Sequence, residues 1–279
     1  MGSFINTWQH LPAQINPDLF SIGSFHLRYY SLMYIVAFAV VYALALYRIK
    51  SEKYEYTAET IQDYLVWAMI GLILGGRLGY VFFYNWSYYS SHLLEIFLPF
   101  DFAQGMKFVG ISGMSYHGGL IGVFITTAYF CIKYKINFWR FVDLLIPAIP
   151  LGYFFGRIGN FINGELFGRV TTVPWGMYFP LDPANSLRHP SQLYEAFFEG
   201  FVLFLVLWLI RKKNFFAGYL LGLYIIGYGL VRFFIELFRE PDYQLGLFLG
   251  IISMGQILCL LMILGGIIIL LWRKNAVSN

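Results

Sequence analysis

The sequence has 279 residues, of which 59% are hydrophobic and only 12% are charged, and its mean hydropathy is +0.64. A soluble globular domain carries about 25% charged residues, so the composition excludes an ordinary soluble enzyme and indicates an integral membrane protein. The net charge of +4 would suit a nucleic-acid partner, but the positions of the basic residues argue against one. We expect a single membrane domain, 1–279, without a separate soluble module.

The chain begins with MGSFINTWQHLPAQINPDLF, which lacks a basic stretch followed by an apolar core, so we expect no cleavable signal peptide. Seven apolar segments follow in chain order, although several are short or interrupted. Because a spanning helix needs about 20 mostly apolar residues, we interpret them as the transmembrane helices of an all-α, polytopic bundle. The segments are 29–47, 60–84, 117–132, 141–158, 191–210, 217–237 and 248–272.

Basic residues are concentrated in alternate connections between these segments and at the C-terminal end. Lys and Arg favour the cytoplasmic side of a membrane, so seven spans would place the N-terminus in the periplasm and the C-terminus in the cytoplasm. Eleven of the 19 basic residues follow this pattern: Arg48, Lys50, Lys53, Lys133, Lys135, Arg140, Arg211, Lys212, Lys213, Arg273 and Lys274.

The other eight basic residues lie within the spans or on the expected outer side, and seven of them are arginines. The arginine fork binds phosphate or carboxylate through two hydrogen bonds, and a charge inside a membrane is usually functional. This bias therefore predicts a binding site. The eight residues are Arg28, Arg77, Lys107, Arg157, Arg169, Arg188, Arg232 and Arg239.

The segment GRIGNFINGELFGR, 156–169, places five polar side chains and four glycines directly after an apolar run. Arg157 and Asn160 share one helix face, whereas Glu165 and Arg169 stand four residues apart and could form a local ion pair. Irregular backbone at membrane depth is tolerated where it lines a polar cavity. We therefore expect the fourth span to break here; the simpler alternative is a cap and a turn that leave the membrane.

The sixth segment ends in GYGLVRFFIELFREPD, 227–242, which carries Tyr228, Arg232, Glu236 and Arg239 on a stripe roughly 110° wide. An Arg232–Glu236 ion pair would be the purely structural interpretation, because buried charges must be paired. Arg239 and Tyr228 lie on the same stripe, so its two arginines exceed its single glutamate and the stripe has a net positive charge. That surplus favours the binding of an anion.

Three further features could belong to the same site. His117 in GISGMSYHGGLIGV opens the third segment at its outer end, where a histidine can act as a general base. Gln192, Glu195 and Glu199 in RHPSQLYEAFFEG lie on one helix face and could balance the arginines; scaffold and site are equally open for them. Arg77 could pair with one of these carboxylates or join the site.

These motifs resemble the bacterial prolipoprotein diacylglyceryl transferases. The family's signature is similar to GRIGNFINGELFG at 156–168, and three further runs match in the family's order: RYYSLMY, SYHGGLIG and YGLVRFFIELFREPD. RHPSQLYE also looks like the family, whereas 85–110 matches no motif of it. The resemblance covers nearly the whole chain.

The resemblance implies an enzyme of the bacterial cytoplasmic (inner) membrane with its active site toward the periplasmic side. Such enzymes transfer the sn-1,2-diacylglyceryl group of phosphatidylglycerol to the lipobox cysteine thiol of a preprolipoprotein. A thioether forms and glycerol phosphate leaves, which is the first step of lipoprotein maturation. The implied partners are phosphatidylglycerol, preprolipoprotein signal peptides and the lipid bilayer, with no nucleic acid.

By the match of motifs, the catalytic positions are His117, Tyr30, Arg157 and Arg232. His117 is the first candidate for the base that activates the thiol, with Tyr30 orienting or relaying, although Glu165 or Glu236 could be the base instead. The arginines would hold the phosphate and stabilise charge as the C–O bond breaks. The expected phosphatidylglycerol-binding residues are Arg157, Asn160, Glu165, Gly168, Tyr228, Arg232, Glu236 and Arg239.

No metal or cofactor is expected, because the histidines are scattered and neither HExxH nor paired-carboxylate spacing occurs. Cys131 and Cys259 lie in apolar stretches without CxxC spacing, which predicts small buried residues. Two rival functions stay open. A transporter for an anionic solute predicts internal repeats and polar groups near the midplane. A non-catalytic lipid-binding protein would need the arginines but not His117 and Tyr30.

Overall fold

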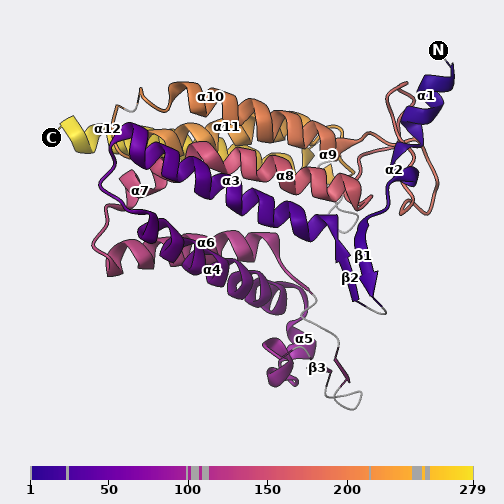
Figure 1. Ribbon diagram of the computed structural model, residues 1–279, viewed down its shortest axis with the longest axis horizontal. Coiled ribbons are helices and arrows are strands. Elements are labelled where there is room, and N and C mark those ends of the chain that lie inside the picture. Colours follow the sequence, from indigo (N-terminus) through magenta and orange to yellow (C-terminus); the bar gives the residue numbers. More distant parts are fainter. Residues whose placement is uncertain are drawn as a thin grey trace. The chain divides into compact units, whose positions relative to one another are not determined.

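A computed structural model describes residues 2–22, 25–98, 100–101, 107–108, 113–213, 215–240, 247–248 and 252–278. The described chain is mostly helical (Figure 1). It divides into two compact units, which we describe separately. The first unit is Met1–Tyr54 with Val142–Asn279, and the second is Glu55–Phe141.

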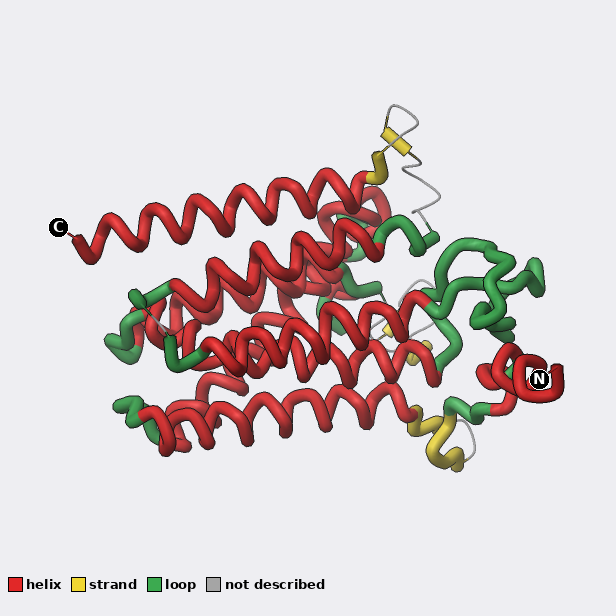
Figure 2. Tube along the Cα trace, turned by 90° about the horizontal axis from the view of Figure 1, so that it is seen from above, coloured by secondary structure: helices red, strands yellow, loops and turns green. Residues whose placement is uncertain are grey.

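The first unit is built from long helices that pack side by side. Its helix α3 packs against α8, α8 against η3, and α11 against α12 (Figure 1). Figure 2 shows α12 as one long helix that ends at the C-terminus. The helices are α1 (Gly2–Gln9), α2 (Leu11–Gln14), α3 (Tyr29–Glu52), η2 (Ile146–Ala148), α8 (Ile149–Ile162), α9 (Ser191–Tyr194), η3 (Glu195–Val202), α10 (Leu203–Ile210), α11 (Tyr219–Ile235) and α12 (Met254–Ser278).

Two of the apolar segments change helix type along their length. Between α7 (Phe138–Leu145) and α8, the chain passes through one 3₁₀ turn that contains Pro147. Proline has no N–H to donate within a helix, so the regular hydrogen-bond ladder is interrupted there. From α9 to α10 the helix continues through η3, a π-helical stretch, which is a rare form that often marks functional sites.

Short antiparallel hairpins add a minor β component that the all-α expectation did not include. In the first unit, β1 (Asp18–Ile22) pairs with β2 (Phe25–Arg28), and β5 (Leu247–Phe248) pairs with β6 (Ile252–Ser253). In the second unit, β3 (Phe100–Asp101) pairs with β4 (Lys107–Phe108). All three hairpins lie outside the long helices, where backbone groups need partners from another segment.

The second unit is dominated by two helices in close contact, α4 (Ala58–Tyr84) and α6 (Tyr116–Lys133). A side chain on Gly75 would collide with the backbone of α6, and one on Gly118 with the backbone of α4. Small residues at such crossings let membrane helices approach closely. The short helices α5 (Trp86–Tyr89) and η1 (Leu93–Ile96) follow α4.

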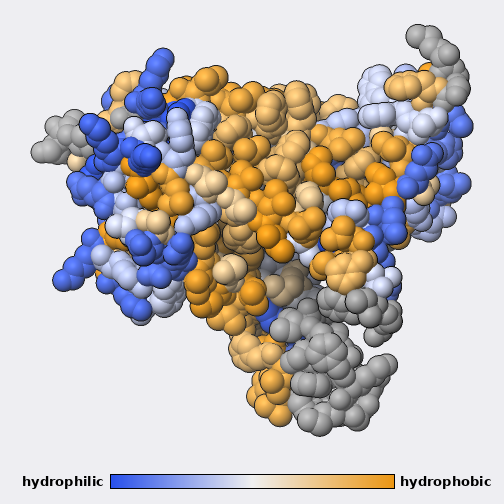
Figure 3. Space-filling model, in the orientation of Figure 1, coloured by the Kyte–Doolittle hydropathy of each residue, from blue (hydrophilic) through white to orange (hydrophobic). Residues whose placement is uncertain are grey.

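All seven apolar segments lie largely on helices, and within the described residues five helices are long and apolar enough to cross a membrane. A sixth, Tyr219–Ile235, is apolar but shorter. Figure 3 shows hydrophobic side chains over the middle of the long helices and hydrophilic ones near their ends. The chain is therefore a multi-pass helical membrane protein, while the count of seven spans stays a prediction. The five are Tyr29–Glu52, Ala58–Tyr84, Phe138–Ile162, Ser191–Ile210 and Met254–Ala276.

The structure refines several expectations. Helix α3 continues to Glu52, so Arg48 is a buried helical residue and not part of an exposed cytoplasmic loop. Helix α12 begins at Met254, six residues later than the expected segment 248–272. Cys131 and Cys259 are both buried and free, as expected for small apolar residues.

Candidate active site

Three arginines meet at the carboxylate of Glu195, the first residue of η3. Arg157 of α8 places its Nε 2.9 Å from Glu195 Oε2, and Arg232 of α11 places Nη1 3.0 Å from the same oxygen. Arg239, which follows α11, donates from Nη1 to Glu195 Oε1 at 2.6 Å. The Glu195 side chain has no exposed surface. We call these residues, with Tyr153, Glu199 and Glu236, the arginine–glutamate cluster.

Glu199 and Tyr153 form the inner part of this cluster. Glu199 Oε1 lies 3.5 Å from Arg232 Nη1, and Glu199 is as fully buried as Glu195. The Tyr153 hydroxyl of α8 lies 3.2 Å from Glu195 Oε2 and 2.5 Å from Glu199 Oε2. The Arg157 guanidinium carbon lies 4.7 Å from the centre of the Tyr153 ring.

The local backbone explains how these groups come together. Glu195 and Glu199 stand at the start and middle of the π-helix η3, whose i→i+5 hydrogen bonds give a wider turn than an α-helix. Residues four apart therefore fall close to one face, and both carboxylates can point toward α8. Gly200 allows the contact, because a Cβ there would lie 2.7 Å from Phe154 Cβ.

Glu236 completes the cluster at the C-terminal end of α11. Its Oε2 lies 3.4 Å from Arg232 Nη2 and 3.4 Å from Arg239 Nε, and its Oε1 accepts a hydrogen bond from Ser253 Oγ at 3.3 Å. The Arg232–Glu236 ion pair of the purely structural interpretation is thus present, whereas the binding role of this stripe stays a prediction. Within the described part of the chain, Arg239 Nε and Glu236 Oε2 are buried without a hydrogen-bond partner. These two atoms face each other at 3.4 Å, an ion-pair contact that is too long for a strong hydrogen bond.

The helix ends within the 156–169 segment, which fits both the predicted break and the alternative of a cap and a turn. Helix α8 ends at Ile162, and Gly164 then adopts a φ of 70°. Asn160 links the broken end to the cluster, because it accepts from Arg157 Nη1 at 3.3 Å and donates from Nδ2 to Glu165 Oε1 at 2.8 Å.

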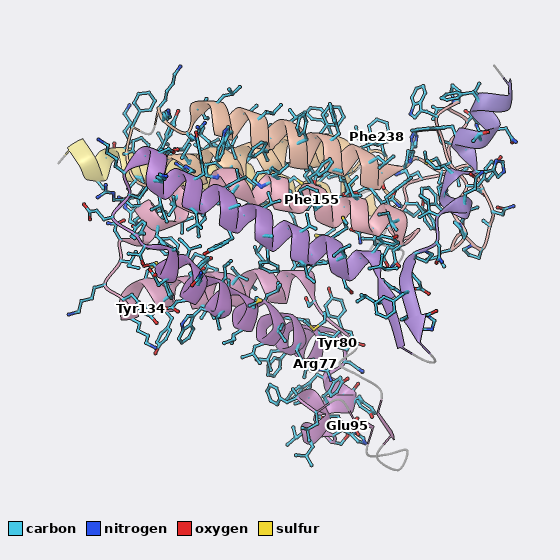
Figure 4. The ribbon with its side chains drawn as sticks, in the orientation of Figure 1. Arg77, Tyr80, Glu95, Tyr134, Phe155 and Phe238 are labelled. Atoms are coloured by element: carbon cyan, nitrogen blue, oxygen red, sulfur yellow. The ribbon has the colours of Figure 1, made fainter. Side chains whose placement is uncertain are left out.

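The alternative Glu165–Arg169 ion pair is replaced by separate partners: Arg169 Nε donates to the carbonyl oxygen of Arg239 at 2.7 Å. Gly168 lies at the same crossing and forms a backbone bridge with Arg239. A Cβ on Gly168 would overlap the carbonyl oxygen of Phe238, the residue labelled near the end of this region in Figure 4. The glycine therefore permits the close backbone contact that fixes Arg239 beside Glu195.

The structure brings two predicted tyrosines toward the cluster. Tyr30, in the first turn of α3, packs against Gly159 of α8 and lies close enough to Asn160 and Glu165 to interact with both. Its hydroxyl is 3.0 Å from that of Tyr34. Tyr228 of α11 meets the Tyr153 ring edge-on, with 6.0 Å between the ring centres.

His117 and Arg77 belong to the second unit. His117 is exposed in the first turn of α6, where its ring lies edge-on to Tyr116, and its role as base stays a prediction. Arg77 is buried and holds the segment after α4: it donates to the carbonyl oxygens of Ile96 at 2.7 Å and Glu95 at 2.6 Å. Figure 4 labels Arg77 and Glu95 in this unit. Arg77 thus has a structural role within its own unit.

The charge of the cluster differs from the expectation drawn from 227–242 alone. Three arginines face three glutamates, so the positive surplus of α11 is balanced by carboxylates from η3. The glutamates and the arginines differ in their exposure to solvent, however. Glu195 and Glu199 are fully buried, whereas the three arginine side chains keep 14–18% of their surface. The arginine side chains are therefore the more accessible members of these pairs.

Outside the helices, the chain before α9 is held by a second type of ion pair. Arg188 contacts Asp182 at 2.8 Å and the exposed Glu240 at 3.0 Å. The Arg188 guanidinium holds the pKa of the Asp182 carboxyl below its usual range. Burial lowers the pKa of His189, whose Nδ1 lies 3.1 Å from the Tyr194 hydroxyl.

Glu195, Glu199 and Tyr153 were not among the predicted site residues. The first two were recognised only as an acidic stripe, since sequence spacing shows that they share a face but not what that face contacts. Tyr153 stood inside an apolar run with nothing to single it out. A pair of glutamates four residues apart within an apolar segment was the available signal, because ionised residues inside membranes are rarely unpaired.

Comparison with known proteins identifies the family. Residues 17–272 match the family model of the prolipoprotein diacylglyceryl transferases. The chain is 56% identical over 280 residues to the phosphatidylglycerol–prolipoprotein diacylglyceryl transferase of Chlorobaculum tepidum, covering all of this chain and 97% of that protein. The enzymes of the same name from Campylobacter jejuni and Campylobacter lari are 45% and 43% identical, over 96% and 98% of this chain and 97% and 98% of theirs. The chain belongs to the prolipoprotein diacylglyceryl transferase family.

Proposed function

We propose that the chain transfers the diacylglyceryl group of phosphatidylglycerol to the cysteine thiol of a prolipoprotein, and that the arginine–glutamate cluster binds the lipid phosphate. The observation that carries the site assignment is the meeting of Arg157, Arg232 and Arg239 at Glu195, with the arginines partly exposed and the carboxylate buried. Planar guanidinium groups suit the oxygens of a phosphodiester. Glu195 would hold the three side chains in position for that anion.

The reaction consumes a thiol and a phosphodiester. The thiol loses its proton to a base and its sulfur attacks the glyceryl carbon. A C–S bond forms, the bond between that carbon and the phosphate oxygen breaks, and glycerol phosphate leaves with the bonding electrons. Arginines at the leaving oxygen stabilise the charge that develops there. A free cysteine thiol has a pKa of about 8.5, so a base is useful at neutral pH. His117 is our candidate for that base.

The remaining predicted residues take supporting roles in this proposal. Tyr30 orients the reacting group or relays a proton, and Asn160 with Glu165 shapes the binding region beside α8. Tyr228 packs against Tyr153, and Gly168 fixes the backbone of Arg239. Glu236 positions Arg232 and Arg239. Glu165 and Glu236 are the alternative candidates for the base.

The site would face the periplasmic leaflet. Within the first unit, Tyr30, Asn160 and Glu195 stand at helix ends on one side, whereas the basic residues 211–213 follow α10 at the opposite end. Basic residues favour the cytoplasmic side, so the cluster lies on the other side. With seven spans, the N-terminus is periplasmic and the C-terminus cytoplasmic, and the single-domain organisation predicted for 1–279 is part of the same proposal.

The test uses the purified full-length protein with phosphatidylglycerol vesicles and a synthetic lipobox peptide. We expect the peptide cysteine to gain the mass of a diacylglyceryl group and glycerol phosphate to be released in equal amount. A matched peptide with serine in place of that cysteine controls for the nucleophile, and vesicles of phosphatidylethanolamine control for the headgroup. Absence of transfer by folded protein would refute the proposal. Vesicle uptake of an anionic solute without transfer would favour a transporter.

A further inference from the structure

In the inner part of the arginine–glutamate cluster, one hydroxyl hydrogen faces two carboxyl oxygens. The Tyr153 hydroxyl lies within hydrogen-bond distance of two carboxyl oxygens, 3.2 Å from Glu195 Oε2 and 2.5 Å from Glu199 Oε2. A phenol carries one hydrogen and can donate it to one acceptor at full strength. An ionised carboxylate has no hydrogen to give. With both glutamates ionised, one of the two contacts would therefore be a repulsive approach of two oxygens.

One added proton removes the conflict. If Glu199 is a carboxylic acid, its O–H donates to the Tyr153 oxygen, and the Tyr153 O–H donates to Glu195 Oε2. Both contacts then become hydrogen bonds, which run from Glu199 to Tyr153 and from Tyr153 to Glu195. The proton belongs on Glu199 and not on Glu195, because Glu195 has three arginine nitrogens within 3.0 Å.

The third glutamate of the cluster is also better paired than Glu199. Glu236 has two arginine nitrogens at 3.4 Å and a hydrogen bond from Ser253. Glu199 has a single arginine nitrogen at 3.5 Å, and its side chain is completely buried. A buried carboxyl with a weak counter-charge favours its neutral form. Glu199 is thus the member of the cluster with the least support for a negative charge.

We propose that Glu199 is a protonated carboxylic acid that positions the cluster's hydrogen bonds through Tyr153 and sets its net charge to +1. The charged and titratable groups that face Glu199 come from three other elements: Tyr153 and Arg157 of α8, Arg232 of α11, and the Cys259 thiol of α12. Glu195 faces it from the same element. With Arg239 and Glu236 included and Glu199 neutral, the cluster has three positive charges, on the three arginines, and two negative charges, on Glu195 and Glu236.

A net charge of +1 matches a phosphodiester, which carries one negative charge. Glu199 would then act as a specificity-determining residue, because the cluster would be neutral once such a lipid is bound. A buried site with unbalanced charge is costly in a low-dielectric medium, so neutrality in the bound state favours singly charged headgroups over zwitterionic or doubly charged ones. This inference rests on the proposed function of the same cluster.

The direct test is infrared spectroscopy of the full-length protein in detergent at neutral pH. A buried carboxylic acid gives a carbonyl stretch that is separate from the carboxylate bands and shifts in D₂O. We expect this band in the wild type, its loss in Glu199→Gln, and its retention in Glu240→Gln, a matched change at an exposed glutamate. Tyr153→Phe should keep the band but move its frequency, because the phenol acceptor is gone. Absence of the band in the wild type, or its survival in Glu199→Gln, would overturn the proposal.

Activity separates this inference from the proposed function. Glutamine is neutral and can donate from Nε2 to the Tyr153 oxygen, so Glu199→Gln should retain clearly more transfer activity than Glu199→Ala. If the wild type transfers but Glu199→Gln is as slow as Glu199→Ala, the neutral-acid proposal is wrong and the proposed function stands. If the folded wild type does not transfer at all, the proposed function fails whatever the infrared band shows.

Discussion

The first unit contains two buried arginine clusters that are put together differently. At the end of α3, Arg48 has no exposed surface, and each of its guanidinium nitrogens has a partner: Glu52, the carbonyl oxygens of Asp143 and Leu144, and the Tyr54 hydroxyl. Glu52 in turn pairs with Arg211 at 3.0 Å. In the arginine–glutamate cluster, three arginines share buried carboxylates and remain partly exposed.

The difference separates a structural arginine from a binding arginine. Arg48 is satisfied by backbone carbonyls that no ligand could replace, so its hydrogen bonds tie α3 to the end of α7. Among the described residues, the partners of the Arg232 guanidinium are carboxylates, and its contacts with them are longer, at 3.0, 3.5 and 3.4 Å. Loosely held guanidinium groups at an accessible edge can accept an anion without breaking the fold.

The largest effect is expected from Arg232→Ala. Removing one electrostatic contact to the developing charge lowers turnover by about 10²–10³-fold, and the loss of a counter-charge for Glu195 should make the effect at least that large. The protein should still insert in membranes and elute as folded protein in detergent. The measurement is the initial rate of peptide lipidation, and near-normal activity would remove Arg232 from the site.

Arg48→Met is expected to lower stability and to leave turnover nearly unchanged, the opposite of Arg232→Ala. The substitution removes one of the two arginines that pair with Glu52 and leaves the carbonyl oxygens of Asp143 and Leu144 without their guanidinium donor; breaking a buried ion pair costs about 3–5 kcal/mol. Thermal unfolding in detergent should therefore begin at a clearly lower temperature, while the fraction that stays folded transfers lipid at nearly the wild-type rate. A specific loss of turnover without loss of stability would contradict the structural assignment.

His117→Gln tests whether the arginine–glutamate cluster is sufficient without a separate base. General-base catalysis contributes about 10²–10⁴-fold, so we expect a large loss at neutral pH. Raising the pH increases the thiolate fraction of the peptide and should restore part of the rate. The measurement is the pH profile of both proteins against the same peptide. A variant profile parallel to that of the wild type would argue against His117 as the base.

The helical, membrane-embedded class and the three arginines of the arginine–glutamate cluster could be predicted from the sequence. Apolar length predicts helices in a membrane without any tertiary information, and the arginines outside the cytoplasmic pattern pointed to 157, 232 and 239. The break after Ile162 was also foreseeable, because polar residues and glycines cluster there.

The residues that each buried charged side chain contacts could not be predicted from the sequence. Nothing in the spacing of Arg48 distinguishes it from a cytoplasmic loop residue, yet it is buried against the carbonyl of Leu144, 96 residues away. Glu195 could not be ranked above Glu165, since its importance comes from three arginines that arrive from other segments. The π-helical turn that aligns Glu195 with Glu199 was not foreseeable from the sequence either.

The smallest effect concerns Asp182 and Arg188, a third arginine pair, which lies outside the helices. Arg188 lowers the pKa of Asp182 in the folded protein, so the pair stabilises the fold at pH values above the ordinary carboxyl pKa of about 3.9. That contribution disappears as the pH falls through the lowered pKa, because the folded state must then also take up the proton. Comparing Asp182→Asn with wild type, we expect a stability difference of about 1–3 kcal/mol at neutral pH, which shrinks only in strong acid. Glu240→Gln, which alters the exposed partner of Arg188, should change the unfolding temperature little at any pH. A difference that vanished already near neutral pH would show that the carboxylate is not held by Arg188.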